Sequence, residues 1–169
     1  MSFADFERAI ASPALKQIAD HWNAARAGRW MPGWSDIKPA SIAAHLPIVR
    51  AYKYDVDGDT FTGRLSGEKI ARIFGKNLGG LPMREIYAPH DYPRLFGRAK
   101  RVVREPAFYR GHGMVFWHID RHGIGERSML PLAADWIVGD GLLGATEYEN
   151  RFMDSALEQP ETDEWFGLD

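Results

Sequence analysis

Three histidines and an aspartate are the residues whose types and spacing come closest to a chemical site. His112, His118 and His122 follow one another at intervals of six and four, and Asp120 stands between the last two. On a strand, His112 and His118 would share a face but lie about 20 Å apart at roughly 3.3 Å per residue, too far to share one metal ion. His118 and Asp120 could form an acid–base pair, but a polar patch beside a turn is the simpler interpretation. The sequence therefore assigns no metal site and no catalytic residue.

Other chemistries are excluded by what the chain lacks. It has no cysteine, so it can form no disulfide, thiolate nucleophile, cysteine-bound zinc site or iron–sulfur cluster held by cysteines. It has no Gly-x-Ser-x-Gly and no His-Glu-x-x-His. The glycine-rich stretch from Arg64 to Gly80 lacks both G-x-G-x-x-G and the Walker ending, and most of its glycines follow a short helix. These glycines are predicted to turn the chain off a sheet, and not to hold a phosphate.

The bulk properties are those of a single globular domain. The chain has 169 residues, of which 45% are hydrophobic and 26% charged. Its net charge of −2 argues against a dedicated nucleic-acid binder. No apolar run approaches the roughly 18 residues of a membrane span, and no signal peptide is visible. We therefore expect a cytoplasmic protein that binds neither nucleic acid nor membrane.

The first long element is an amphipathic helix over Pro13–Ala27. Ser12 provides a capping hydroxyl and Pro13 occupies the first helical position. Apolar residues then recur at helical spacing, namely Leu15, Ile18, Ala19 and Trp22. This stripe must lie either on the domain itself or on a second chain.

The remainder predicts an α+β fold. A hairpin is expected around Asp57-Gly58-Asp59, and a longer helix is expected to end before Pro106. The predicted strands are Ile48–Tyr54, Thr60–Leu65, Phe108–Ile119, Glu126–Ala133 and Leu142–Tyr148. Short helices are expected over Glu68–Phe74 and Met83–Ile86. This order gives a five-stranded antiparallel sheet with helices on one face.

Two charged segments need an interpretation. The longer helix carries basic residues that fall mostly outside its apolar stripe: Arg94, Arg98, Lys100, Arg101 and Arg104. A solvated helix face is the simpler interpretation, and an anionic partner is the alternative. The tail from Asn150 is acidic but contains the aromatic pair Trp165-Phe166. We expect this pair to dock on the domain, with a separate partner as the alternative.

The order of elements and several segments resemble the PAS domain. "RLSGEKIARIFGKNLGG" resembles its second strand leaving into its first short helices, and "ERSMLPLAAD" and "GLLGATEYE" resemble its last two strands. "HWNAARAGRWMPGWSDIKPASIAAHLPIV" resembles the lead-in of a bacterial subgroup of stand-alone, single-PAS-domain proteins. The resemblance covers roughly residues 14 to 149. Gly63 departs from it, because a bulkier strand residue is expected there.

The resemblance implies a layout and a pocket. It divides the chain into a helical lead-in over 1–46, a PAS-like domain over 47–149 and an acidic tail over 150–169. It also implies the spatial strand order 2-1-5-4-3 and a small apolar pocket between the sheet and the segments Ile70–Phe74 and Leu95–Val103. The wall residues and candidate ligand contacts are Phe61, Leu65, Phe74, Phe96, Phe116 and Leu130.

The resemblance also bears on cofactors and partners. Flavin photochemistry of the light-sensing kind and cinnamoyl photochemistry both need a cysteine, so both are excluded. Haem-binding members use a histidine on or near the long helix, and His90 alone is placed there; capping or solvent exposure is the simpler role, so haem is not expected. The cofactor is therefore unknown. PAS-like domains often pair through a flanking helix, which predicts a homodimer held by Leu15, Ile18, Ala19 and Trp22.

These expectations lead to one functional hypothesis and two alternatives. The first is a stand-alone sensory or interaction module that binds a small ligand or an unidentified protein partner, without catalysis. The second is a small cone-shaped α+β enzyme of isomerase or dehydratase type, using His118 and Asp120. The third is a structural dimerisation module whose pocket is filled with side chains.

Overall fold

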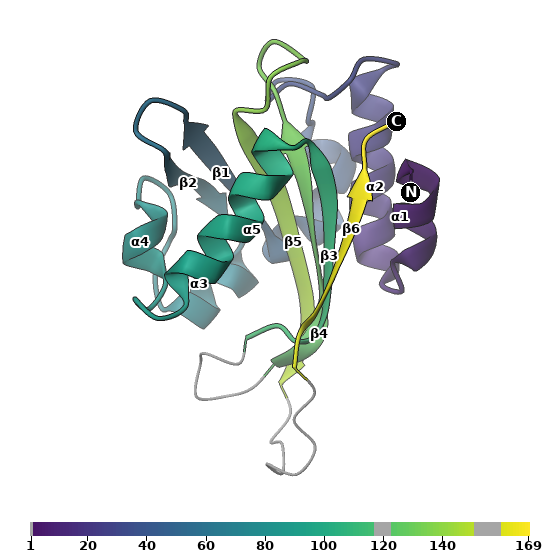
Figure 1. Cartoon of the computed structure of the whole chain (residues 1–169). Coiled ribbons are helices and arrows are strands. Elements are labelled where there is room, and N and C mark those ends of the chain that lie inside the picture. Colours follow the sequence, from purple (N-terminus) through teal and green to yellow (C-terminus); the bar gives the residue numbers. More distant parts are fainter. Residues whose placement is uncertain (1, 117–122, 151–159) are drawn as a thin grey trace.

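The computed structural model describes residues 2–116, 123–150 and 160–169 and contains one antiparallel sheet (Figure 1). The strand order is β2-β1-β5-β4-β3-β6. The bounds are β1 Val49–Asp55, β2 Thr60–Ser66, β3 Ala107–Met114, β4 Gly123–Leu132, β5 Gly141–Asn150 and β6 Thr162–Gly167. The first five strands have the spatial order 2-1-5-4-3 that the PAS resemblance implied. The α+β class is confirmed, but the sheet has a sixth strand that was not predicted.

Helices cover both faces of the sheet: the helices between β2 and β3 lie on one face, as predicted, and the N-terminal helices cover the other (Figure 1). On the outer face lie α1 Phe3–Ala9 and α2 Pro13–Arg26, and on the inner face lie α3 Glu68–Phe74, α4 Met83–Ile86 and α5 Tyr92–Arg104. A 3₁₀ helix, η1 Pro39–Ile48, leads into β1. Strands that are buried on both faces lose the alternation of apolar and polar residues. The first four residues of β1 are all buried, which is this pattern. Across the described residues, no helix has the length and apolar character needed to cross a membrane.

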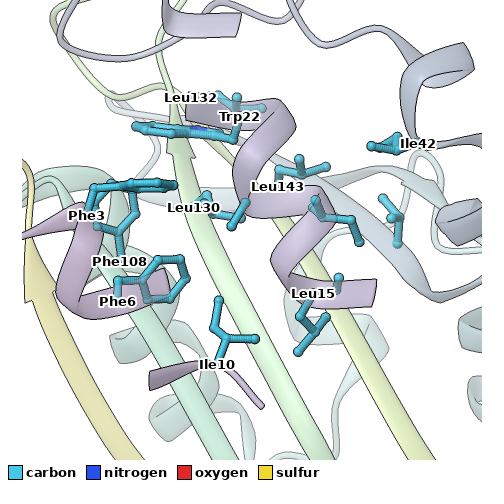
Figure 2. Packing of buried hydrophobic residues seen from close by; sticks show 14 of the residues in the cluster. Phe3, Phe6, Ile10, Leu15, Trp22, Ile42, Phe108, Leu130, Leu132 and Leu143 are labelled. Carbon is cyan, nitrogen blue, oxygen red and sulfur yellow. The ribbon is translucent and has the colours of Figure 1, made fainter. Parts of the chain in front are cut away.

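The outer core joins α1 and α2 to the sheet (Figure 2). Trp22 packs beside the rings of Phe3 and Phe108, and its indole N–H donates a hydrogen bond to the carbonyl oxygen of Pro131 at 2.7 Å. The predicted dimer contacts Leu15, Ile18, Ala19 and Trp22 are all 0% exposed within one chain. That interface prediction was therefore wrong, because the stripe covers the outer face of its own sheet.

The inner core lies between the sheet and α3 to α5, and four of the six predicted pocket residues pack in it: Phe61, Phe74, Phe96 and Phe116. None of the six lines the small chamber on this face. The other two do not face the inner core. Leu130 belongs to the outer core, because its neighbour Met129 faces the inner core and successive residues of a strand point to opposite faces. Leu65 is 41% exposed because it lies at a register shift in the β1–β2 pair.

Gly63 is required by a close backbone approach. Its N–H donates to the carbonyl oxygen of Leu81 at 2.8 Å, and its own carbonyl accepts from the N–H of Gly80 at 2.7 Å. A Cβ at this position would overlap the carbonyl oxygen of Leu78. The absent side chain is thus replaced by the segment that follows α3, and Gly75 ends that helix in the left-handed conformation.

The C-terminal tail completes the sheet. β6 pairs with β3 in antiparallel register, with Trp165 opposite Tyr109 and Phe166 opposite Phe108. Phe166 is buried in the outer core, and Trp165 packs against the ring of Tyr109 with a centroid distance of 5.0 Å. The predicted docking of this aromatic pair on the domain is confirmed. The lead-in and the tail both contribute to the cores of the 47–149 region.

Candidate functional site

The polar residues singled out in the sequence do not form a described site. His118, Asp120 and His122 lie outside the described residues, and His112 is on β3. Within the described ranges, no group of three His, Cys, Asp or Glu side chains could hold a metal ion. The side chain of His90 is 72% exposed, with Nε2 3.4 Å from Asp91 Oδ2. A largely exposed histidine beside a carboxylate matches the simpler role expected for it.

The chamber beneath α4 and α5 is small. Its volume is about 10 Å³, and it is lined by Arg50, Tyr52, Met83, Tyr87, Leu95, Ala99, Met129 and Leu142. A volume of roughly 10–15 Å³ is the least that holds one water molecule. The chamber therefore has no room for the apolar ligand that the resemblance implied. Its polar lining is the feature to explain.

Arg50 brings a charge into this chamber. It alternates along β1 with Tyr52 and Tyr54, so all three face inward, and it is 1% exposed. Its side chain lies across β5 at Gly144, where a Cβ would come within 3.2 Å of Arg50 Cγ. Arg50 Nη1 donates to Thr146 Oγ1 at 2.6 Å. Its Nη2 has no hydrogen-bond partner among the described residues.

Arg127 of β4 is a second buried guanidinium on the inner face, also 1% exposed. Its Nε lies 2.9 Å from Glu161 Oε1 but does not point at that oxygen, and its Nη2 has no hydrogen-bond partner in the described part of the chain. Burial lowers the pKa of Arg127, Glu161 opposes this effect, and the charge of Arg50 adds to it. Arginine nevertheless stays protonated in proteins. The positive charges of Arg50 and Arg127 therefore repel each other within the inner face.

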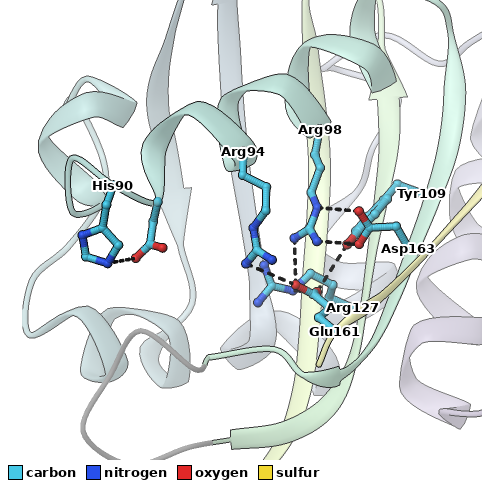
Figure 3. A network of polar contacts seen from close by, with 8 residues as sticks. His90, Arg94, Arg98, Tyr109, Arg127, Glu161 and Asp163 are labelled. Carbon is cyan, nitrogen blue, oxygen red and sulfur yellow. Dashed lines mark hydrogen bonds and ion pairs between the residues drawn. The ribbon is translucent and has the colours of Figure 1, made fainter. Parts of the chain in front are cut away.

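Glu161 stands at the centre of a polar network between α5, β4 and β6 (Figure 3). Its carboxylate is 1% exposed and accepts from Arg98 Nη1 at 2.7 Å. Arg98 also forms two hydrogen bonds with Asp163, while the hydroxyl of Tyr109 donates to Asp163 at 3.0 Å. Arg98 is 5% exposed, so the solvated-face interpretation was wrong for this residue. It faces carboxylates that come from the far C-terminal end of the chain.

Neutral phenols complete the inner face. The hydroxyl oxygens of Tyr52 and Tyr87 are 3.2 Å apart, within hydrogen-bonding distance. Burial raises the pKa of Tyr52 well above its usual value, and the neighbouring Tyr87 adds to the rise. Burial and the charge of Glu161 likewise raise the pKa of Tyr109. The hydroxyls of Tyr52 and Tyr109 therefore stay protonated and can donate hydrogen bonds at neutral pH.

We expect the protein to lose stability in alkali through these tyrosines. Because their folded pKa values lie above the unfolded value of about 10, their contribution is intact below about pH 10 and is lost as the pH rises further. Each should reduce the free energy of unfolding by up to about 1.4 kcal/mol per pH unit. Denaturant unfolding between pH 8 and 11 measures this slope. In the double variant Tyr52→Phe/Tyr109→Phe, the free energy of unfolding should fall less steeply with pH. A slope equal to that of wild type would show that these two tyrosines are not the cause.

The buried arginines were not identified from the sequence, although one signal was available. In β1 a cation alternates with two tyrosines, which places it on an aromatic, inward face. Arg127 was missed because the face assignment of β4 was wrong by one residue. Glu161 was missed because it reaches the site only when the tail returns to the sheet.

The inner face holds buried cations whose donors are incompletely paired. Arg50, Arg98 and Arg127 supply three positive charges and Glu161 and Asp163 two negative ones. Asp91, at the start of α5, adds a buried carboxylate whose Oδ2 has no hydrogen-bond partner among the described residues. A buried guanidinium without a carboxylate partner attracts an anion more strongly than an exposed one, because the surrounding dielectric constant is low. The described guanidinium groups can thus bind and orient an acceptor.

The comparisons with known proteins agree with this fold. A sequence model described as a PAS domain matches residues 10–136, well over half of the chain. Comparison with curated proteins and with solved structures gave no match. The match spans the lead-in helix, the hairpin, the short helices, α5, and strands β3 and β4. The chain belongs to the PAS domain family.

Proposed function

We propose that this protein is a PAS sensory module that binds a small ligand in the chamber beneath α4 and α5, without catalysis, and signals by association. One observation carries the proposal: Arg50 lines the chamber, and its buried Nη2 has no hydrogen-bond partner among the described residues. A module with a purely structural core would gain stability by replacing that charge with an apolar side chain. A retained, incompletely paired charge is the mark of a site that binds something.

The two alternatives have less support. A structural dimerisation module agrees with the small volume of the chamber but leaves the buried charges of the inner face without a role. The enzyme alternative depends on His118 and Asp120, which lie outside the described residues. The inner-face carboxylates Glu161 and Asp163 are paired with Arg98, which favours binding over proton abstraction.

The output is proposed to be association with a second copy or a protein partner. It must use a surface other than the stripe of α2, which is buried in its own chain. The turn between β4 and β5 is one such surface, because Trp136, Ile137 and Val138 are 45%, 68% and 53% exposed. Exposed apolar residues that are contiguous in the chain are typical of interaction sites. The proposed location of the protein is the cytoplasm, as expected from its sequence.

Native mass spectrometry of freshly purified protein tests this proposal, because it reports bound ligand and oligomeric state together. We expect either a retained small molecule or a mass that changes between one and two chains when a ligand is added. The variant Arg50→Met should bind less of the ligand at unchanged fold. If wild type and Arg50→Met both keep the mass of the bare chain, with no ligand retained or taken up and no change in oligomeric state, the structural alternative is favoured.

A further inference from the structure

We propose that the ligand of this chamber is a small monoanion, held by the free Nη2 of Arg50. This inference rests on the proposed sensory function and names the chemical class of its ligand. The shared chemistry is one negative charge on a very small body: a halide ion is nearest in size to the chamber, and the carboxylate of a very small organic acid would need its walls to move.

The first argument is charge. Arg50 has a hydroxyl partner in Thr146 but no ion pair with a carboxylate among the described residues, and it is 1% exposed. Glu161 lies within ion-pair distance of Arg94, Arg98 and Arg127, so it is already shared by three cations. A buried cation of this kind is destabilising unless a counter-ion accompanies it. A bound anion would supply the missing acceptor.

The second argument is size. The chamber of about 10 Å³ accommodates one body about as large as a water molecule. Its lining residues include Arg50, Tyr52 and Tyr87, which carry polar groups, and the apolar Met83, Leu95 and Leu142. The apolar walls exclude water and so strengthen the attraction between a guanidinium and an anion. A larger dianion such as sulfate would need the walls to move.

The third argument is that the sequence keeps space for the guanidinium. Gly144 lies under the Arg50 side chain, and a Cβ there would stand 3.3 Å from Nε as well as 3.2 Å from Cγ. These contacts are tighter than ordinary van der Waals separations, so with a larger residue at this position the arginine would have to shift by a few tenths of an ångström. Gly144 therefore lets the Arg50 side chain lie close against β5.

Thermal unfolding at constant ionic strength tests the inference. Chloride, formate and acetate are each titrated against sodium sulfate as the balancing salt. We expect a saturable rise in Tm for wild type, reaching about 5 °C or more at about 100 times the Kd. Chloride alone would identify a halide site, whereas formate or acetate would identify a carboxylate site. Isothermal titration calorimetry with the effective anion should give one site per chain.

The matched variants are Arg50→Met, which keeps the length and removes the charge, and Arg8→Met, whose side chain is 75% exposed. Arg50→Met should lose the saturable rise, and Arg8→Met should keep it. If Arg50→Met does not fold, Arg50→Lys should fold and bind at least tenfold more weakly, because it lacks the planar fork. Equal anion responses in wild type and the Arg50 variant would overturn the inference and leave a water molecule in the chamber. If the anions have no such effect but native mass spectrometry shows a bound neutral ligand, the proposed sensory function is retained and only the assignment of the ligand as an anion is rejected.

Discussion

Replacing Trp22 with alanine is expected to lower the free energy of unfolding by about 3–5 kcal/mol, the usual cost of deleting a large buried aromatic side chain. Trp22 is 0% exposed, contacts the rings of Phe3 and Phe108, and donates a hydrogen bond to Pro131. The change removes the packing of α2 on the outer face together with that hydrogen bond. Urea unfolding followed by circular dichroism measures the loss. Trp22→Glu would add an unpaired buried carboxylate and should prevent folding.

Trp30→Ala is the matched control, because Trp30 is 44% exposed. Its effect on the free energy of unfolding should stay within about 0.5 kcal/mol, as for most surface substitutions. The mass of each variant in solution is measured alongside. A Trp22→Glu chain that remains folded and has half the mass of wild type would show that the helix joins two copies, contrary to the structure.

Neutralising Glu161 should have an effect of similar size. In Glu161→Gln, the buried Arg98 and Arg127 lose their shared carboxylate, and leaving a buried charge without its partner typically costs about 3–5 kcal/mol. The loss should begin at β6, which follows Glu161 directly. Hydrogen exchange of the β6 amides and the fluorescence of Trp165, which packs on Tyr109, report that strand separately from the rest of the sheet.

Two further variants test whether charge is the cause. Glu164→Gln removes a carboxylate that pairs with Arg110 on the other face of β6 and is 38% exposed, so its cost should be at most about 1 kcal/mol. In Glu161→Leu/Arg127→Met, one cation is removed with the anion, and much of the lost stability should return. Equal losses in the Glu161 and Glu164 variants, without recovery in the double variant, would mean that the strand itself matters and the buried pair does not.

Local patterns predicted the elements well. The Asp57-Gly58-Asp59 turn, the Ser12-Pro13 start of α2 and the helix over Glu68–Phe74 all lie where short-range signals place them. These features depend on neighbouring residues, for which turn chemistry and capping are decisive. The spatial order of the first five strands came from the PAS resemblance, because contacts between distant strands leave no such local mark.

Burial was harder to predict than secondary structure. The apolar stripe of α2 required a cover, but its sequence is equally compatible with a second chain and with its own sheet. The faces of β4 depend on a register that one residue can invert, which is how Leu130 was misplaced and Arg127 missed. The pairing of Arg98 with Glu161 joins positions 63 residues apart, and no local rule links them.

The position of β6 has a consequence for how the sheet can meet an extended peptide. Binding by strand addition needs an open edge with free backbone N–H and C=O groups. The edge of β3 is already occupied by the chain's own C-terminal strand, and the edge of β2 is partly met by the segment around Pro82. A strand tethered to the same chain acts at an effective concentration of the order of millimolar. A peptide that would pair with β3 must therefore displace β6, and the edge that the sheet offers on this side is that of β6 itself.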